Sequence, residues 1–240
     1  MKKVLLFLLS AVVLFSSCRF VTGKKIRGNG NVQTVSRNET GFTGVHSSGS
    51  FDIYVSTGSA NSVKIEAEEN ILPYIETYVE NGILKIDTKD GVWLDTKRDV
   101  KIYITAPEYN EISSSGSGDI IGQNLLTSKN KLELKVSGSA DIKAEVDAPA
   151  IEASSSGSGD MELKGQTKTF KGDVTGSGNI HAMDLKTEET TIKIVGSGDA
   201  EVYASVKLEV HVSGSGDITY KGNAQVNSHI AGSGSVKKLD

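Results

Sequence analysis

The sequence has few of the residues that usually stabilise a small secreted domain. Only one of its 240 residues is cysteine, so no disulfide can form within the chain. Three prolines exclude a proline-rich stalk. Aromatic residues make up 6% of the chain, whereas there are 26 glycines. This composition disfavours a core of large side chains and favours a narrow core of stacked aliphatic residues.

The sequence also lacks an excess of basic residues. Its formal net charge is −4 at pH 7, and this balance disfavours binding to nucleic acid. No long basic stretch indicates electrostatic attachment to a membrane surface either. The length allows one elongated domain or two small ones.

The N-terminus has the pattern of an export signal. Two lysines precede an apolar run over residues 4–15, which is too short to span a bilayer as a helix. We therefore predict a signal peptide over residues 1–17. It resembles a bacterial lipoprotein signal, with Phe15 where leucine is usual, and this predicts a lipid on Cys18. That lipid would tie the protein to the outer membrane, facing the periplasm or the cell surface. The alternative is a plain secretory signal with an incidental cysteine.

A Gly-Ser-Gly-Asp motif recurs through the second half of the chain. Its first glycines stand 18 to 22 residues apart, and an apolar residue follows four positions after each of them. Apolar residues also alternate with polar ones before the motif, as at Leu132, Leu134 and Val136. Period-two alternation is typical of strands with one buried face. The seven copies begin at Gly116, Gly138, Gly157, Gly176, Gly196, Gly214 and Gly232.

Each repeat reads as a strand, a Gly-Ser-Gly-Asp corner, a second strand and a more variable corner. One such coil cannot bury its inward side chains alone, but stacked copies can. We predict an all-β parallel β-helix, or solenoid, with coils of about 18–22 residues. Its domain covers residues 38–240, with irregular coils over 38–112 and regular coils over 113–240, after a lipidated linker over 18–37. A β-sandwich is the structural alternative.

The residues of the corner suit a tight turn. Glycine reaches positive φ without a Cβ clash, and we expect the second glycine to be less demanding because Ala140 replaces it once. Serines stacked on serines could form a ladder of hydroxyls. Aspartate tolerates the left-handed region and can bond its own nearby backbone. A calcium ladder is the alternative, but one carboxylate per coil is poor coordination for an ion that takes 6–8 oxygens. We expect turn capping and no metal at Asp119, Asp141, Asp160, Asp199 and Asp217.

Five of the eight tryptophan and tyrosine residues lie between Ile71 and Tyr109. Terminal coils of solenoids often deviate in order to cap the core, so capping is one interpretation of this cluster. The other is a binding surface for a glycan or another chain, with Trp93 as the first candidate and Tyr74 and Tyr78 after it. A short helix or an irregular loop is expected over residues 71–79, and a tight turn at residues 81–82.

Several segments together resemble the head GIN domain family of auto-transporter adhesins, which is common among Bacteroidetes lipoproteins. They are residues 44–46 leading to 51–55, residues 81–86, and the Gly-Ser-Gly-Asp/Asn-Ile series. The resemblance covers residues 38 to the C-terminus. It implies a right-handed β-helical fold and an adhesive role, and it carries over no site residues.

We therefore expect a cell-envelope lipoprotein with a non-catalytic, β-helical adhesin or binding domain that uses no cofactor. Its expected partners are the membrane, through Cys18, and a glycan or protein ligand, and it could form a homo-oligomer. An envelope signalling or regulatory protein is one alternative, and a β-helical glycan-active enzyme is another. The sequence gives little support for an enzyme, because no histidine has an evident serine or cysteine nucleophile beside it. The histidines are His46, His181, His211 and His229.

Overall fold

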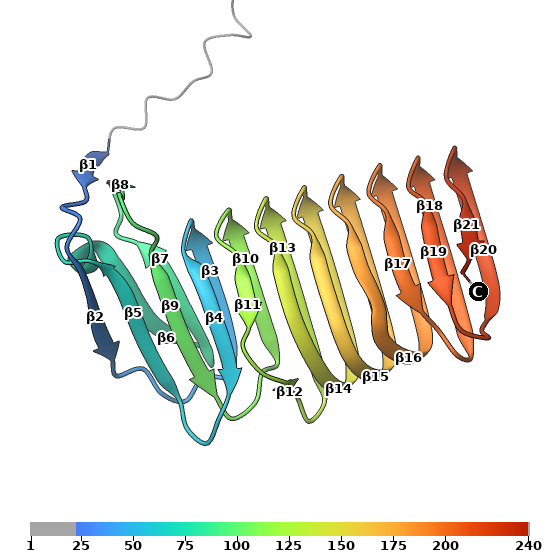
Figure 1. Cartoon of the computed structure of the whole chain (residues 1–240), viewed down its shortest axis with the longest axis horizontal. Coiled ribbons are helices and arrows are strands. Elements are labelled where there is room, and N and C mark those ends of the chain that lie inside the picture. The colour runs from blue at the N-terminus through green and yellow to red at the C-terminus, as the bar shows by residue number, and fades with distance from the viewer. Residues whose placement is uncertain (1–22, 240) are drawn as a thin grey trace, which may run out of the picture.

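The computed structural model describes residues 23–239, and it is a β-solenoid of parallel coils stacked along one axis (Figure 1). The all-β solenoid fold predicted from the repeat is therefore confirmed. The predicted signal peptide and the lipid attachment at Cys18 lie outside the described residues. Within the described range, no helix is long and apolar enough to cross a membrane.

Residues 23–239 form 21 strands and one short 3-10 helix. They are β1 (Lys24–Arg27), β2 (Val32–Arg37), β3 (Gly44–Gly49), β4 (Asp52–Thr57), β5 (Ser62–Glu68), η1 (Leu72–Tyr74), β6 (Ile75–Glu80), β7 (Ile83–Thr88), β8 (Val92–Asp95), β9 (Lys101–Ala106), β10 (Glu111–Gly116), β11 (Ile120–Gly122), β12 (Leu126–Thr127), β13 (Lys131–Gly138), β14 (Ile142–Gly157), β15 (Met161–Gly176), β16 (Ile180–Gly196), β17 (Ala200–Tyr203), β18 (Lys207–Gly214), β19 (Ile218–Lys221), β20 (Gln225–Gly232) and β21 (Val236–Lys238).

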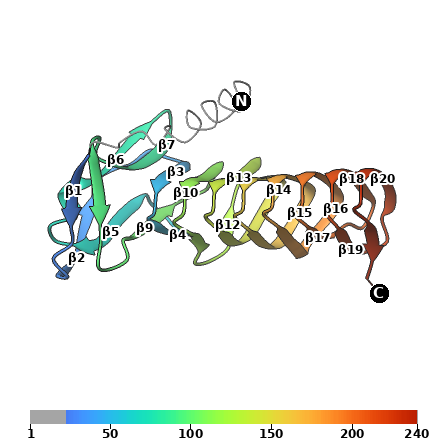
Figure 2. The same cartoon turned by 90° about the horizontal axis from the view of Figure 1, so that it is seen from above.

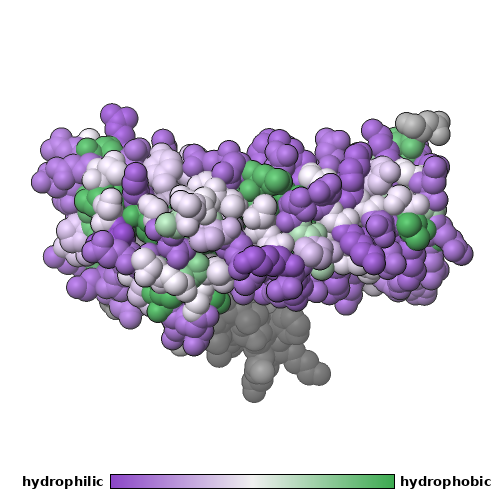
Figure 3. Space-filling model, turned by 90° about the horizontal axis from the view of Figure 1, so that it is seen from below, coloured by the Kyte–Doolittle hydropathy of each residue, from purple (hydrophilic) through white to green (hydrophobic). Residues whose placement is uncertain are grey.

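These strands form two walls around a thin core (Figure 2). The incoming sheet runs in the order β6, β7, β3, β10, β13, the second halves of β14 to β16, β18 and β20, and from β3 onward its strands run into a glycine-serine corner. The outgoing sheet runs in the order β2, β5, β9, β4, β11, the first halves of β14 to β16, β17, β19 and β21, and from β4 onward its strands leave such a corner. The lower side of the solenoid is mostly hydrophilic, with scattered apolar side chains (Figure 3).

The core consists of columns of aliphatic side chains, one residue from each coil. The residue four places after the first glycine shows this arrangement, because its copies pair in register from coil to coil. Each of the six copies before the last coil is at most 1% exposed. The apolar position read from the repeat is therefore an inward position, as predicted. The column runs Ile120, Ile142, Met161, Ile180, Ala200, Ile218.

Both glycines of the corner are required by close backbone approach. Gly157 has φ +136°, and a Cβ there would lie 2.2 Å from the carbonyl oxygen of Gly138 in the preceding coil. At the second glycine, a Cβ on Gly178 would lie 2.2 Å from the carbonyl oxygen of Gly159. The second glycine has no positive φ, so it is less demanding in its backbone conformation, as expected, but the close approach makes its space equally tight.

The aspartates cap turns, but not in the way that the sequence suggested. Among the described residues other than glycine, only Asn81 has positive φ, so the aspartates are not left-handed. Each carboxylate instead accepts from the next coil: the N–H of Asp160 donates to Oδ1 of Asp141 (2.8 Å), and that of Asn179 donates to Oδ1 of Asp160 (2.8 Å). The carboxylates therefore bond adjacent coils to one another.

The N-terminal end departs from the repeat. Strand β3 lies between β7 and β10, and β4 lies between β9 and β11, so the coils there are not stacked in sequence order. Antiparallel strands β2, β5 and β6 close this end. Residues 71–79, expected to form a helix or loop, form the short helix η1 and most of β6. The predicted turn is confirmed, with φ 52° at Asn81 and 76° at Gly82.

Candidate functional site

A hollow of about 480 Å³ lies where the irregular coils meet the first Gly-Ser corner. Its walls come from β8, from the end of β7, from the segment that leads into β9, and from the corner around Gly49. Among the strands of residues 23–239, β8 pairs with β1 alone, in a separate two-stranded sheet, so it stands apart from the solenoid wall. This excursion of the chain creates the hollow.

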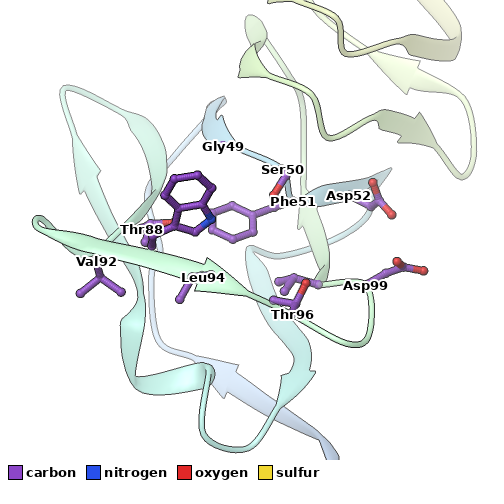
Figure 4. Close-up of a pocket in the computed structure, with 11 residues that line it drawn as sticks. Gly49, Ser50, Phe51, Asp52, Thr88, Val92, Leu94, Thr96 and Asp99 are labelled. Atoms are coloured by element: carbon purple, nitrogen blue, oxygen red, sulfur yellow. The ribbon is translucent and has the colours of Figure 1, made fainter. Parts of the chain in front are cut away.

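The hollow has an aromatic wall and an acidic end. Trp93 on β8 is 61% exposed, whereas Phe51 beneath the corner is 2% exposed. Asp52 and Asp99 lie together at one end of the hollow and Val92 lies at the other (Figure 4). An exposed indole and two acidic residues therefore line the same hollow.

Asp52 is the more unusual of the two acids. Burial raises its pKa above the ordinary value, and the negative charges of Asp119 and Asp99 raise it further. The backbone N–H of Asp119, 3.4 Å from Oδ1, and the charge of Lys101 act in the opposite direction without cancelling the effect. Asp52 therefore keeps its proton to a higher pH than an ordinary aspartate.

An aromatic pair lies next to the hollow on the outer face of the outgoing sheet. Tyr54 and Tyr103 pair in register on β4 and β9, and their rings stack with centroids 5.0 Å apart and planes 20° apart. Tyr54 follows Asp52 by two residues, so the two side chains lie on the same face of β4. The outward row continues to Ile121 on β11. Aromatic surface thus extends beyond the hollow.

The structure separates the aromatic candidates named from the sequence. Trp93 lines the hollow, but Tyr74 and Tyr78 do not. Tyr74 packs against the core, and Tyr78 is 46% exposed on β6, where its hydroxyl lies 3.5 Å from Asp87. Tyr109 is fully buried and serves the core. The capping interpretation therefore fits Tyr74 and Tyr109, which pack in the core, while a binding role for Trp93 stays a prediction.

Sequence reasoning missed the two acids and the tyrosine pair. The alternation in β4 already placed Asp52 and Tyr54 on the outer face, and this was the available signal. No signal in the sequence indicated Asp99, because its place beside the hollow depends on the path of β8. Within residues 23–239, no group of three or more histidine, cysteine, aspartate or glutamate side chains is arranged to hold a metal ion.

One histidine does have serine neighbours, contrary to the expectation from the sequence. The Oγ of Ser48 lies 3.3 Å from Nε2 of His46, and the Oγ of Ser113 lies 2.9 Å from Nδ1. Burial and the charge of Lys85 lower the pKa of His46, which favours the neutral ring. The hydroxyl of Ser113 in turn donates to the carbonyl of Val45 (3.2 Å), so the network ends on the main chain. It contains no carboxylate to orient the imidazole, and its residues do not line the hollow.

Comparisons with known proteins agree with this architecture. None of the curated proteins matches the sequence. Among solved structures, a putative adhesin from Bacteroides fragilis superposes with a TM-score of 0.83 at 26% identity, covering 89% of this chain and 100% of its own. A putative lipid binding protein from Parabacteroides distasonis gives 0.74 at 28% identity, covering 90% and 100%. A putative adhesin from the same species gives 0.73 at 26%, with the same coverage.

The family model described as "Putative auto-transporter adhesin, head GIN domain" matches residues 41–224. This range contains β4, β8, β9 and the hollow, together with all the regular coils up to β19. The resemblance noted in the sequence is therefore confirmed, and the chain belongs to the head GIN domain family.

Proposed function

We propose that this protein is a non-catalytic binding protein of the cell envelope, and that its ligand is a glycan bound in the hollow beside Trp93. The observation that carries the proposal is the 61% exposure of Trp93 on the wall of a hollow that also contains Asp52 and Asp99. Exposing a large aromatic side chain to water has no structural benefit here, because Trp93 is not part of the core.

The chemistry of the hollow suits a sugar. A pyranose ring has an apolar face that can stack on an indole, while its hydroxyls donate to carboxylates. Asp52 and Asp99 supply acceptors at the end of the hollow, and Ser50 and Thr96 also line it. Binding sites combine apolar walls with a few placed polar groups in this way. The stacked pair of Tyr54 and Tyr103 offers a further aromatic surface beside it.

Membership of an adhesin family supports a location at the cell surface or in the envelope. For this protein we propose attachment through a lipid on Cys18, after removal of residues 1–17. Four residues separate Cys18 from Gly23, where the described fold begins, so the fold would lie close to the membrane surface. Mass spectrometry of the protein extracted from membranes tests the lipid, because lipidation would add the mass of the acyl groups to a chain that begins at Cys18. Cys18→Ser is the control and should lack this added mass.

The resemblance to a protein named as lipid binding suggests a second ligand class. Acyl chains require apolar surroundings, and the two carboxylates of the hollow oppose their burial. We therefore favour the glycan. Phospholipid vesicles serve as the comparison in the experiment below.

Trp93 is the only tryptophan in the chain, so its fluorescence reports directly on the hollow. We expect an array of bacterial and host glycans to identify a ligand, and titration with that glycan to shift the emission of Trp93. The variant Trp93→Ala should lose binding at least tenfold, which corresponds to about 1.4 kcal/mol. It should keep its melting temperature.

Tyr78→Ala is the matched control, because Tyr78 is an exposed aromatic residue outside the hollow. It should bind as the parent protein does. Equal binding by Trp93→Ala and the parent would overturn the assignment of the hollow. Binding to vesicles alone, with no glycan retained on the array, would replace the glycan by a lipid.

A further inference from the structure

The apolar core is covered at the N-terminal end of the solenoid but not fully covered at the C-terminal end. At the N-terminal end, antiparallel strands and η1 cover the core, and Leu72 of η1 is 7% exposed. At the C-terminal end, β20 pairs only with β18 among the described strands. Val226 and Ile230 on β20 are half-buried, whereas Leu208 and Val212, their partners on β18, are at most 1% exposed. The last coil therefore leaves one side of its apolar column uncovered.

Strand β20 also lacks the usual protection of an edge. Edge strands are commonly kept from pairing by charged residues, prolines or bulges. None of the eight residues from Gln225 to Gly232 is charged or proline. By contrast, the edge strand β6 at the other end carries Glu76 and Glu80. The neighbouring edge strand β21 is three residues long and carries Lys237 and Lys238.

The hydrogen bonds of β20 show which backbone groups are free. The N–H of Gln225 donates to the carbonyl of Val206 (2.9 Å), and the N–H of Ser233 donates to that of Gly214 (3.0 Å). Backbone groups alternate in direction along a strand, so the odd-numbered residues of β20 bond to β18. The even-numbered residues Val226, Ser228 and Ile230 therefore point their N–H and C=O groups away from the solenoid.

We propose that this edge binds a second copy of the chain, through antiparallel pairing of β20 with the same strand about a two-fold axis at Ser228. Even-numbered residues must pair with even-numbered ones, because only they have free backbone groups at the edge. Centring the pair on Ser228 places Val226 opposite the partner's Ile230 on the inward face. On the outward face it places Asn227 opposite the partner's His229.

A second copy fits this edge because the strand is complementary to itself. Reading outward from Ser228, both directions give a polar residue and then a β-branched apolar residue, which an isologous two-fold interface requires. Moving the centre by one residue would pair Ser228 with an apolar residue and lose this match. Since β20 carries no charge, the two strands do not repel one another. The dimer would place the two Trp93 hollows at its far ends, near the N-terminal coils.

Cross-linking tests the register directly. The chain from residue 19 onward contains every described residue and has no cysteine. In the proposed pair the two Ser228 Cα atoms lie about 5.5 Å apart, within the range for a disulfide. We expect Ser228→Cys to form a covalent dimer on mild oxidation. Asn227→Cys is the matched control, since its two copies would lie about 8 Å apart, too far for a bridge.

A mixture gives a second test of the register. Asn227→Cys and His229→Cys should each form little covalent dimer alone but form a mixed disulfide together, because those two residues face one another across the axis. If Ser228→Cys cross-links no more than Asn227→Cys, or if the mixture forms no mixed disulfide, the proposed pairing is wrong.

Sedimentation over a wide range of concentration tests the dimer without a cross-link. Ser228→Pro removes an N–H that the bonds to β18 do not use, and proline is tolerated on such an edge. We expect Ser228→Pro to weaken the dimer by about tenfold or more, while Ser228→Ala, which keeps the N–H, dimerises as the parent does. A monomeric parent at every concentration overturns the proposal, as does equal dimerisation by Ser228→Pro when its melting temperature shows that it is folded.

Discussion

The regular coils and the irregular N-terminal coils solve the same packing problem in opposite ways. In the regular coils one small set of contacts recurs: Ser177 N–H to the carbonyl of Gly157 (2.9 Å), Asn179 N–H to the carboxylate of Asp160 (2.8 Å), and an inward aliphatic residue after each corner. No single copy has a special position. The stability of this region is therefore shared among many similar interfaces between neighbouring coils.

The N-terminal coils depend instead on contacts that occur once. The buried carboxylate of Glu68 accepts from the backbone N–H groups of Gly30 and Lys97, and the guanidinium of Arg37 donates to the carbonyls of Leu72 and Ile75 (3.3 Å each). The hollow beside Trp93 also lies here. Repetition gives a rigid rod, whereas departure from repetition gives both the cap and the concave surface on which a ligand can be held.

The largest effect should come from adding one methyl group to a regular corner. In Gly176→Ala the new Cβ would lie 2.3 Å from the carbonyl oxygen of Gly157, at a residue with φ +124°. Relief would require the coils to separate, so we expect a loss of at least about 3 kcal/mol in the free energy of unfolding. Urea denaturation followed by circular dichroism measures it.

Gly41→Ala is the control from the irregular region. Gly41 has φ +75° but no atom within 4 Å of the added Cβ, so only the backbone penalty of about 1 kcal/mol applies. Equal losses at the two sites would show that the corner can shift, and the comparison between the regions would fail.

The second largest effect should be a loss of stability when the buried carboxylate of Glu68 is replaced or protonated. Burial alone would raise the pKa of Glu68, but N–H groups of Lys97, Gly30 and Arg98 outweigh it and hold the pKa below its ordinary value. A lowered pKa in the folded state means that this carboxylate stabilises the fold above its unfolded pKa of 4.5. The contribution is lost as the pH falls through the folded pKa.

Glu68→Gln should therefore cost about 2 kcal/mol at pH 7, because the charged acceptor is replaced by a neutral amide. The loss should shrink as the pH is lowered through the acid range. Hydrogen exchange of the backbone amides over residues 24–37 measures the loss of stability locally. This segment contains Gly30, whose N–H donates to the Glu68 carboxylate. A loss that stays the same at low pH would contradict the assigned protonation.

The repeat made the regular half of the molecule predictable. The spacing of the glycines and the alternation of apolar residues predicted the coil length, the parallel stacking and the inward column from Ile120 to Ile218. Each of these features depends only on residues within one repeat and on the equivalent residues of the next repeat. The acceptor role of the aspartates was not predictable. Their partner belongs to the next coil, and local turn rules consider only the residue's own backbone.

The site was predictable only in part. Trp93 stood out because it is a lone tryptophan in a chain with few aromatics, but Asp52 and Asp99 become its neighbours only through the excursion of β8. Nor did the sequence reveal that β3 and β4 lie between strands that follow them in the chain. These arrangements depend on long-range pairing, which no repeat specifies.

A smaller effect is expected at a buried hydroxyl of the irregular region. The hydroxyl of Tyr109 donates to the carbonyls of Ser56 (2.9 Å) and Ile104 (3.2 Å). Tyr109→Phe keeps the ring but leaves these buried acceptors without the hydroxyl, so we expect a loss of about 1–2 kcal/mol. Tyr103→Phe, on the outer face, should change the stability by less than about 0.5 kcal/mol. Thermal melting of both variants tests the difference, and equal losses would contradict the structural role assigned to Tyr109.

The smallest effect tests whether the aspartates of the corner act by charge or by hydrogen bonding. Asp160 accepts the N–H of Asn179 and lies between Asp141 and Asn179 in the ladder. Asp160→Asn keeps an acceptor oxygen and removes one negative charge, so we expect stability within about 0.5 kcal/mol of the parent, and slightly higher at low salt. Asp160→Ala removes the acceptor and should cost about 1 kcal/mol. Melting at low and high salt separates the two contributions.

A large loss in Asp160→Asn would mean that the charge itself holds the coils together. The natural Asn179 argues against this, because it occupies the same place in the ladder and accepts the N–H of Asp199 at 2.9 Å.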